Sequence, residues 1–290
     1  NNEVNTMSKL NNKALLVQLT VRQATMRKRD KKATQDIAVS NNAEVTSGNY
    51  NKALLPMAQP LDDIKKLTTQ IRQMFYDNTL PWGIEGTMIL PSKNYLSFME
   101  MYRKAKSQWL VLVDKFIKDY PRLIRNAEIS LGNLYDPNDY PDTHDLRSRF
   151  DMNIMVMPVP ADDFRVSIPD NELAQVRADV GAQVESATTK AMHEAWQRLY
   201  DRVKHISDKL HDPKSIFRDT LIDNTKDICD VLKRLNINDD ENLERLRAEV
   251  EQSFTKLHPE SLRNDPHLRT QKSNEASDII KRMGAYMGNI

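Results

Sequence analysis

The stretch between Pro169 and Pro213 constrains the fold of this chain more than any other feature. It contains a single glycine, Gly181, and no other residue that strongly disfavours a helix. Apolar side chains recur along it at steps of three and four residues, which places them on one face of a single helix. They are Leu173, Val176, Val180, Val184, Ala187, Ala191, Ala195, Leu199, Val203, Ile206 and Leu210. At 1.5 Å per residue this helix is roughly 60 Å long, so it needs a partner along its length, from its own chain or from a second copy.

The composition agrees with long, solvated helices. Charged residues make up 29% of the 290 residues, and the mean hydropathy is -0.65. The net charge of +1 means that any contact with nucleic acid must rest on a local patch. Cys229 is the only cysteine, which excludes an intrachain disulfide and a zinc site built from cysteines, and indicates a reducing, cytoplasmic setting. No apolar run is long enough to span a membrane.

Alternating apolar and polar residues predict strands at 14–22 and 150–158. Shorter pieces are expected at 82–90, where Gly83 and Gly86 indicate a tight hairpin, and at 164–166. Helical spacing predicts helices at 61–76, 92–120, 216–235, 240–257 and 274–287, and Pro121 is expected to begin a separate helix that ends at Gly132. The fold class that follows is α+β, mostly α, with a small antiparallel sheet and a long-helix C-terminal arm or bundle. We expect residues 1–13 to be a flexible N-terminus, 14–168 an α+β domain, and 169–290 the helical arm or bundle.

A cluster of basic residues begins at the last residue of the first predicted strand and continues just after it, and we call it the basic knot. Its members are Arg22, Arg27, Lys28, Arg29, Lys31 and Lys32. Cations at this density suit the phosphates of single- or double-stranded nucleic acid. The alternative is a solvated, charged turn. Single-strand binding is favoured by aromatic residues on which bases stack. The nearest aromatic residue, Tyr50, is not close in sequence, so the sequence gives no support for stacking.

The acidic loop at 135–145 offers oxygen ligands of the kind that Ca²⁺ or Mg²⁺ binds. They are Asp136, Asn138, Asp139, Asp142 and Asp145, together with His144. The EF-hand pattern is absent, and Asp and Asn beside proline are also ordinary turn formers, so we expect no metal.

The usual catalytic and cofactor motifs are also absent. Gly83 and Gly86 do not form a phosphate-binding loop, and His193 begins a zinc-helix pattern that lacks its second histidine because Gln197 stands there. We therefore predict no catalytic residues, no cofactor and a non-enzymatic protein. Cys229 is expected to pack inside a helix bundle rather than act as a nucleophile.

Two further features are candidate contact sites. Trp82 lies in a turn, where it is either a plug for the core or an exposed anchor for a partner. The small residues Ala187, Ala191 and Ala195 form a row that permits close helix–helix approach, either within the chain or as a self-association seam. Trp109 and Trp196 lie in helices and are expected in the core.

A series of short motifs, in this order, resembles an uncharacterised family found in bacteriophages and integrative elements. They are Arg27-Lys28-x-Asp30-Lys31-Lys32-Ala33-Thr34, Asn78-Thr79-Leu80-Pro81-Trp82, Leu90-Pro91-x-x-Asn94-Tyr95, Tyr120-Pro121, Leu131-Gly132, Asp139-Tyr140-Pro141, Pro158-Val159-Pro160, Asp163-Phe164-Arg165-Val166, Phe217-Arg218-Asp219 with Asn224, and Leu235-Asn236. The resemblance spans most of the chain. It implies genes near a CobS- or MoxR-like AAA+ ATPase and a von Willebrand factor A-like protein, and in some elements near single-strand annealing and exonuclease genes. It carries over no catalytic residues.

Three hypotheses follow. The first is a non-enzymatic interaction or accessory protein of a phage or mobile element, which forms a homo-oligomer and works with an AAA+ ATPase in the host cytoplasm. The second is a nucleic-acid-binding protein, a single-strand DNA binder or annealing accessory that uses the basic knot. The third is an enzyme that holds a metal at the acidic loop.

Overall fold

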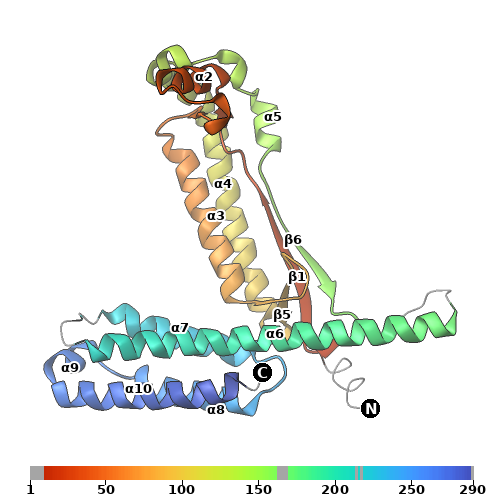
Figure 1. The fold of residues 1–290 in the computed structure, drawn as a ribbon, viewed down its shortest axis with the longest axis vertical. Coiled ribbons are helices and arrows are strands. Elements are labelled where there is room, and N and C mark those ends of the chain that lie inside the picture. Colours follow the sequence, from red (N-terminus) through yellow and green to blue (C-terminus); the bar gives the residue numbers. More distant parts are fainter. Residues whose placement is uncertain (1–9, 162–168, 213–214, 216–217, 289–290) are drawn as a thin grey trace. The chain divides into compact units, whose positions relative to one another are not determined.

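The structure is a computed structural model that describes residues 10–161, 169–212, 215 and 218–288 (Figure 1). Contacts between residues group the chain into two compact units. Unit 1 takes in Asn1–Gln18, Met74–Met99 and Met155–Ile290, and unit 2 takes in Leu19–Gln73 and Glu100–Ile154. This grouping differs from the expected division at 168/169, because the hairpin around Trp82 packs in the same core as the C-terminal helices.

The sheet is antiparallel in its two registered pairs, and its four strands follow the order β4-β5-β1-β6. Its strands are β1 (Ala14–Arg22), β4 (Leu80–Pro81), β5 (Met88–Pro91) and β6 (Asp151–Pro158). Ala14 lies opposite Pro91 and Val17 opposite Met88. The strands predicted at 14–22 and 150–158 are therefore confirmed, and the piece at 82–90 is the turn and second strand of the β4–β5 hairpin. The strand predicted at 164–166 lies outside the described residues.

Unit 1 is built around the long helix α6, which runs as one element of 42 residues from Asp170 to His211, as the sequence predicts. The helices that follow it are α7 (Asp219–Leu235), α8 (Glu241–Phe254), α9 (Pro259–Asn264) and α10 (Pro266–Met287). Helix α10 lies along α6 (Figure 1). It begins earlier than predicted because Asp265 caps it, its carboxylate accepting from the amides of His267 and Leu268 at 2.9 Å.

Unit 2 contains most of α3 (Gln59–Asp77) and of α4 (Ser92–Leu131). Within this unit Trp109 is fully buried and its Nε1 donates to Thr68 Oγ1 at 2.9 Å. The helix boundary predicted at Pro121 is wrong, since α4 continues through it. Pro121 is exposed, so its ring meets solvent, while Tyr120 and Leu123 on either side stay buried and keep the helix on its core.

The remaining part of unit 2 is formed of short elements. They are β2 (Arg27–Arg29), α2 (Lys31–Ser40), the 3-10 turn η1 (Val45–Ser47) and β3 (Asn51–Ala53), followed later in the chain by η2 (Gly132–Leu134), η3 (Pro137–Asp139) and α5 (Thr143–Ser148). Strands β2 and β3 pair antiparallel, with Lys28 opposite Lys52 and Arg29 opposite Asn51. We call residues 27–53 the cap. None of the helices that the structure describes is long and apolar enough to cross a membrane.

Candidate binding site at the cap

The basic knot forms strand β2 and the first turn of α2, together with Arg22 at the end of β1. Asp30 separates the strand from the helix. Its carboxylate accepts from the amide of Ala33 at 2.9 Å and so caps α2, which is why the chain turns here. All side chains of the knot are exposed, and five of them have no ion pair within the described part of the chain. They are Arg22, Arg27, Arg29, Lys31 and Lys32.

A buried ion cluster fastens the cap to the acidic loop. The Lys52 side chain is only 6% exposed, and its Nζ lies 2.8 Å from Asp139 Oδ2 and 3.1 Å from Asp30 Oδ2. It also donates to the carbonyl oxygen of Leu134 at 2.6 Å. Lys28 pairs with the other oxygen of Asp139, whose side chain is 2% exposed. Lys28 is therefore engaged within the chain, and the exposed charge of the knot is smaller than the sequence suggests.

The pKa values in this cluster shift so that its groups stay charged. The hydrogen bond from the amide of Ala33, followed by that from Lys52, lowers the pKa of Asp30. Burial alone raises the pKa of Asp139, but hydrogen bonds from Lys28 and Lys52 outweigh it and lower this pKa overall. Burial likewise opposes the charge of Lys52, and its two carboxylate partners raise its pKa overall. The cluster is thus a fixed structural clamp at neutral pH.

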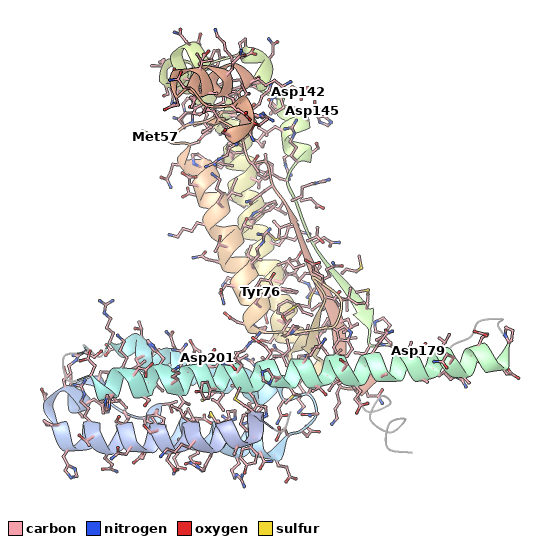
Figure 2. The ribbon with its side chains drawn as sticks, viewed as in Figure 1. Met57, Tyr76, Asp142, Asp145, Asp179 and Asp201 are labelled. Carbon is pink, nitrogen blue, oxygen red and sulfur yellow. The ribbon has the colours of Figure 1, made fainter. Side chains whose placement is uncertain are left out.

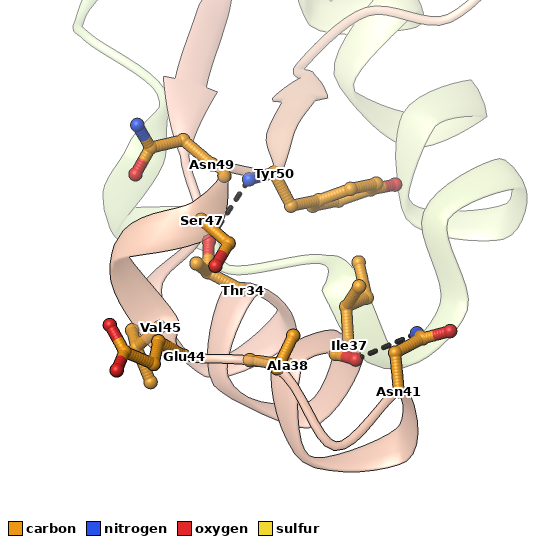
Figure 3. Close-up of a pocket in the computed structure, with 11 residues that line it drawn as sticks. Thr34, Ile37, Ala38, Asn41, Glu44, Val45, Ser47, Asn49 and Tyr50 are labelled. Carbon is orange, nitrogen blue, oxygen red and sulfur yellow. Dashed lines mark hydrogen bonds between the residues drawn. The ribbon is translucent and has the colours of Figure 1, made fainter.

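A pocket of about 330 Å³ opens beside α2, and we call it the α2 pocket (Figure 3). Its lining residues are Thr34, Ile37, Ala38, Asn41, Ala43, Glu44, Val45, Ser47, Gly48, Asn49 and Tyr50. Thr34 Oγ1 accepts from the amide of Tyr50 at 3.0 Å, which ties α2 to the start of β3. Ile37 and Val45 at the pocket are 49% and 47% exposed. The walls combine aliphatic side chains with the ring of Tyr50 (Figure 3).

Other apolar side chains of unit 2 are also exposed. Val39 on α2 is 69% exposed, and Met57, just before α3, is 92% exposed (Figure 2). Neither residue lines the α2 pocket, so only Ile37 and Val45 bear on a contact surface there. The α2 pocket is not evident from the sequence, because its walls come from a helix and a loop whose approach depends on the β2–β3 pairing.

The acidic residues of the loop at 135–145 have structural roles. Asp136 accepts from the amide of Asn138 at 2.9 Å, and Asp142 caps α5 by accepting from the amide of Asp145 at 2.8 Å. Asp139 belongs to the ion cluster. Within the described ranges, no group of three or more His, Cys, Asp or Glu side chains is arranged to hold a metal ion.

Two predicted contact sites are buried within unit 1, and both predictions need correction. Trp82 is 9% exposed and belongs to the core, so it is a plug and not an exposed partner anchor. Ala187 is 4% exposed, and Ala191 and Ala195 are fully buried, so these residues cannot form a self-association seam. Ala187 Cβ lies 3.6 Å from the position that a Cβ on Gly83 would take, because the small side chain lets the hairpin approach α6. The homo-oligomer stays a prediction.

The predictions for the core are confirmed. Trp109 and Trp196 are both fully buried. Cys229 is also fully buried, and burial raises the pKa of its thiol to about 12. A buried, protonated thiol is a packing group rather than a nucleophile.

No protein-family model, curated protein or solved structure matches this chain. The resemblance to the phage and mobile-element family therefore stays a prediction. The chemistry of the cap has to be argued from its own residues.

Proposed function

We propose that this protein is a non-enzymatic interaction protein, and that the α2 pocket docks a short segment of a protein partner with an apolar side chain flanked by acidic ones. The observation that carries this proposal is an aliphatic pocket, with Ile37 and Val45 half-exposed, beside helix α2, whose first turn carries Lys31 and Lys32 of the basic knot. Binding of an apolar side chain in such a pocket is favourable, because the apolar atoms of both the side chain and the pocket leave water.

The charges nearby favour acidic residues in the docked segment. Lys31 shares a face of α2 with Thr34 and Ala38, which line the pocket, because helical residues three and seven apart lie on one side. Cations at the rim of an apolar pocket speed association with an acidic segment and select against a basic one. Glu44 also lines the pocket and would repel an acidic residue. The acidic residues of the segment are therefore expected on the side of the pocket where Lys31 lies.

The partner to test first comes from the family resemblance, which implies a CobS- or MoxR-like AAA+ ATPase. The protein then acts as an adaptor or accessory of that ATPase in the cytoplasm of the cell that carries the element. This assignment of the partner rests on the resemblance alone, whereas the pocket stands on its own geometry.

The test is biolayer interferometry of the immobilised protein against the purified ATPase. Ile37→Asp and Val45→Asp place a charge at the pocket, and each is expected to weaken binding by about tenfold or more. Val39→Asp is the matched control, since Val39 is exposed on the same helix and does not line the pocket. Equal weakening by all three variants, or by none, contradicts docking at the α2 pocket.

A second candidate is single-stranded DNA binding, and the structure supplies one observation in its favour. The β2–β3 register places Tyr50 next to the knot, where its carbonyl oxygen accepts from the amide of Asp30 at 2.9 Å. An aromatic residue near exposed cations favours single-strand binding, because a base can stack on its ring while the cations contact phosphates. The sequence alone separates these residues by about twenty positions.

Fluorescence anisotropy with labelled single-stranded and duplex DNA, at low and physiological salt, tests this candidate. The variant changes Arg27, Arg29, Lys31 and Lys32 to Ala and leaves Lys28 in its ion pair. Wild type is expected to make four phosphate contacts on a single strand through these residues. The logarithm of its binding constant should then fall with the logarithm of the salt concentration, with a slope of about -3. Tyr50→Leu is expected to weaken single-strand binding and spare duplex binding. Unchanged affinity in the fourfold variant excludes the knot as the site.

A further inference from the structure

Unit 1 contains a second pocket, of about 520 Å³, between the C-terminal part of α6 and the start of α7. We call it the α6–α7 pocket. Its lining residues are Arg202, His205, Lys209, Asp212, Ser215, Arg218, Thr220, Leu221 and Asn224. Cationic and hydrogen-bonding groups predominate here, in contrast to the aliphatic walls of the α2 pocket.

The charges of this lining favour an anion. Three cations, Arg202, Lys209 and Arg218, line the pocket together with one carboxylate, that of Asp212. Within the described chain, none of the three cations takes part in an ion pair. Gathered cations without partners repel one another, and a bound anion removes that cost.

Arg202 also lines this pocket, with its side chain half-buried. The planar fork of arginine matches two oxygens of a phosphate group, and the pocket provides the space for one beside it.

The helix ends at this pocket reinforce the positive potential. Helix α7 begins after Arg218, whose side chain makes no capping hydrogen bond to it, and Thr220 and Leu221 of its first turn line the pocket. The N-terminal end of a helix carries a partial positive charge. Asp219 in the same turn offsets part of it and is not among the lining residues.

At the other end, the C-terminal carbonyl groups of α6 would repel an anion. Arg269 neutralises them, because its guanidinium donates to the carbonyl oxygens of Leu210 at 3.0 Å and Lys209 at 3.2 Å, and also to that of Asp212. The negative end of the α6 dipole is therefore covered, while the N-terminal end of α7 receives no side-chain cap from Arg218.

We propose that the α6–α7 pocket binds a phosphate group of a phosphorylated ligand, with Arg202, Lys209 and Arg218 as its charged contacts. The hydroxyl of Thr220 and the amide of Asn224 are placed to fix the ligand's orientation. The volume exceeds that of a single phosphate, so the ligand carries more than one phosphate or an organic group. This site lies in unit 1 and does not depend on the function proposed for the cap.

The test is isothermal titration calorimetry of the full chain with inorganic phosphate and with pyrophosphate at low salt. Wild type is expected to bind pyrophosphate more tightly than phosphate. Lys209→Gln and Arg218→Gln are each expected to weaken pyrophosphate binding at least about fivefold, as is usual when one charged contact to a phosphate is lost. Lys204→Gln is the matched control, because Lys204 is an exposed cation of α6 that does not line the pocket.

Two results overturn the proposal: no binding of either anion by folded wild-type protein, or equal weakening by the control, which indicates non-specific attraction. Circular dichroism of each variant verifies that it is folded. A 5′-phosphorylated oligonucleotide, added as a competitor, identifies the source of the phosphate. Displacement of pyrophosphate by it points to nucleic acid, and absence of displacement points to a small phosphorylated molecule.

Discussion

Replacing Lys52 by methionine tests how the cap is fastened to the acidic loop within unit 2. The substitution keeps most of the side-chain volume and removes the ammonium that Asp30 and Asp139 share. Lys52 Nζ lies 2.8 Å from Asp139 Oδ2, and its hydrogen bond to Leu134 O is 2.6 Å long. After the change, the Asp139 carboxylate, with a side chain only 2% exposed, has Lys28 as its remaining cation, and the Lys28 side chain is 52% exposed.

The magnitude follows from this geometry. Removing one partner of a buried ion pair costs about 3–5 kcal/mol, because the other charge remains out of water. Here Lys28 continues to neutralise Asp139, which retains part of the interaction. We therefore expect Lys52→Met to reduce the free energy of opening the cap by about 2–3 kcal/mol, below the full range for a buried pair.

Native-state hydrogen exchange is the suitable assay, because a chain with two compact units need not unfold in a single step. The reporter is the amide of Asp30, which donates to the carbonyl oxygen of Tyr50 at 2.9 Å and exchanges only when the cap opens. The control is Lys65→Met, which removes an exposed pair with Asp62 and is expected to cost less than about 0.5 kcal/mol. If Lys52→Met lowers protection no more than Lys65→Met does, the clamp has no structural role.

The pH dependence gives a second check on the same clamp. The pKa values of Asp30 and Asp139 are lowered from 3.8, so their ionised forms stabilise the fold fully above that pH. This contribution is lost as the pH falls through the lower, folded-state values. The difference in opening free energy between wild type and Lys52→Met should therefore shrink below about pH 4. A constant difference between pH 7 and pH 2 contradicts this interpretation.

Three further predictions concern the helical bundle of unit 1. Cys229, fully buried with a thiol pKa of about 12, should resist a thiol reagent at pH 8 in native protein and react at once in urea; labelling of native protein contradicts its packing role. Asp265→Ala removes the α10 cap and should cost about 1 kcal/mol in urea unfolding, whereas Asp265→Asn should cost less. Ala191→Leu forces extra volume into a fully buried site and should cost about 1–3 kcal/mol, with no change of oligomeric state in light scattering.

The elements that the sequence predicts well are those with a long, unbroken period. Helix α6 and strands β1 and β6 are of this kind, since a helix or strand pattern repeated over many residues leaves few alternatives. Pro121 shows the limit of local rules. Its ring disfavours a helix interior, yet the buried neighbours Tyr120 and Leu123 hold α4 together through it, and their packing depends on distant parts of the chain.

The candidate site was only partly predictable for a related reason. The number of cations in the knot is visible in the sequence, but the one that is neutralised depends on Asp139, which lies 111 positions from Lys28. Tyr50 comes close to the knot only through the β2–β3 pairing. The α2 pocket, which Tyr50 lines, depends on the same pairing. Long-range pairings of this kind have no signature in a single sequence.

The basic knot and the acidic loop, two separate candidates in the sequence, turn out to share one structure. Asp139 neutralises Lys28, and Lys52 joins Asp139 to Asp30 at the start of α2. The acidic loop therefore serves to hold the cap in place, and a metal would have to compete with lysines for Asp139. A variant that also removes Lys28 would mix loss of binding with loss of the clamp. A test of binding by the knot therefore changes its other exposed cations and leaves Lys28 and the clamp intact.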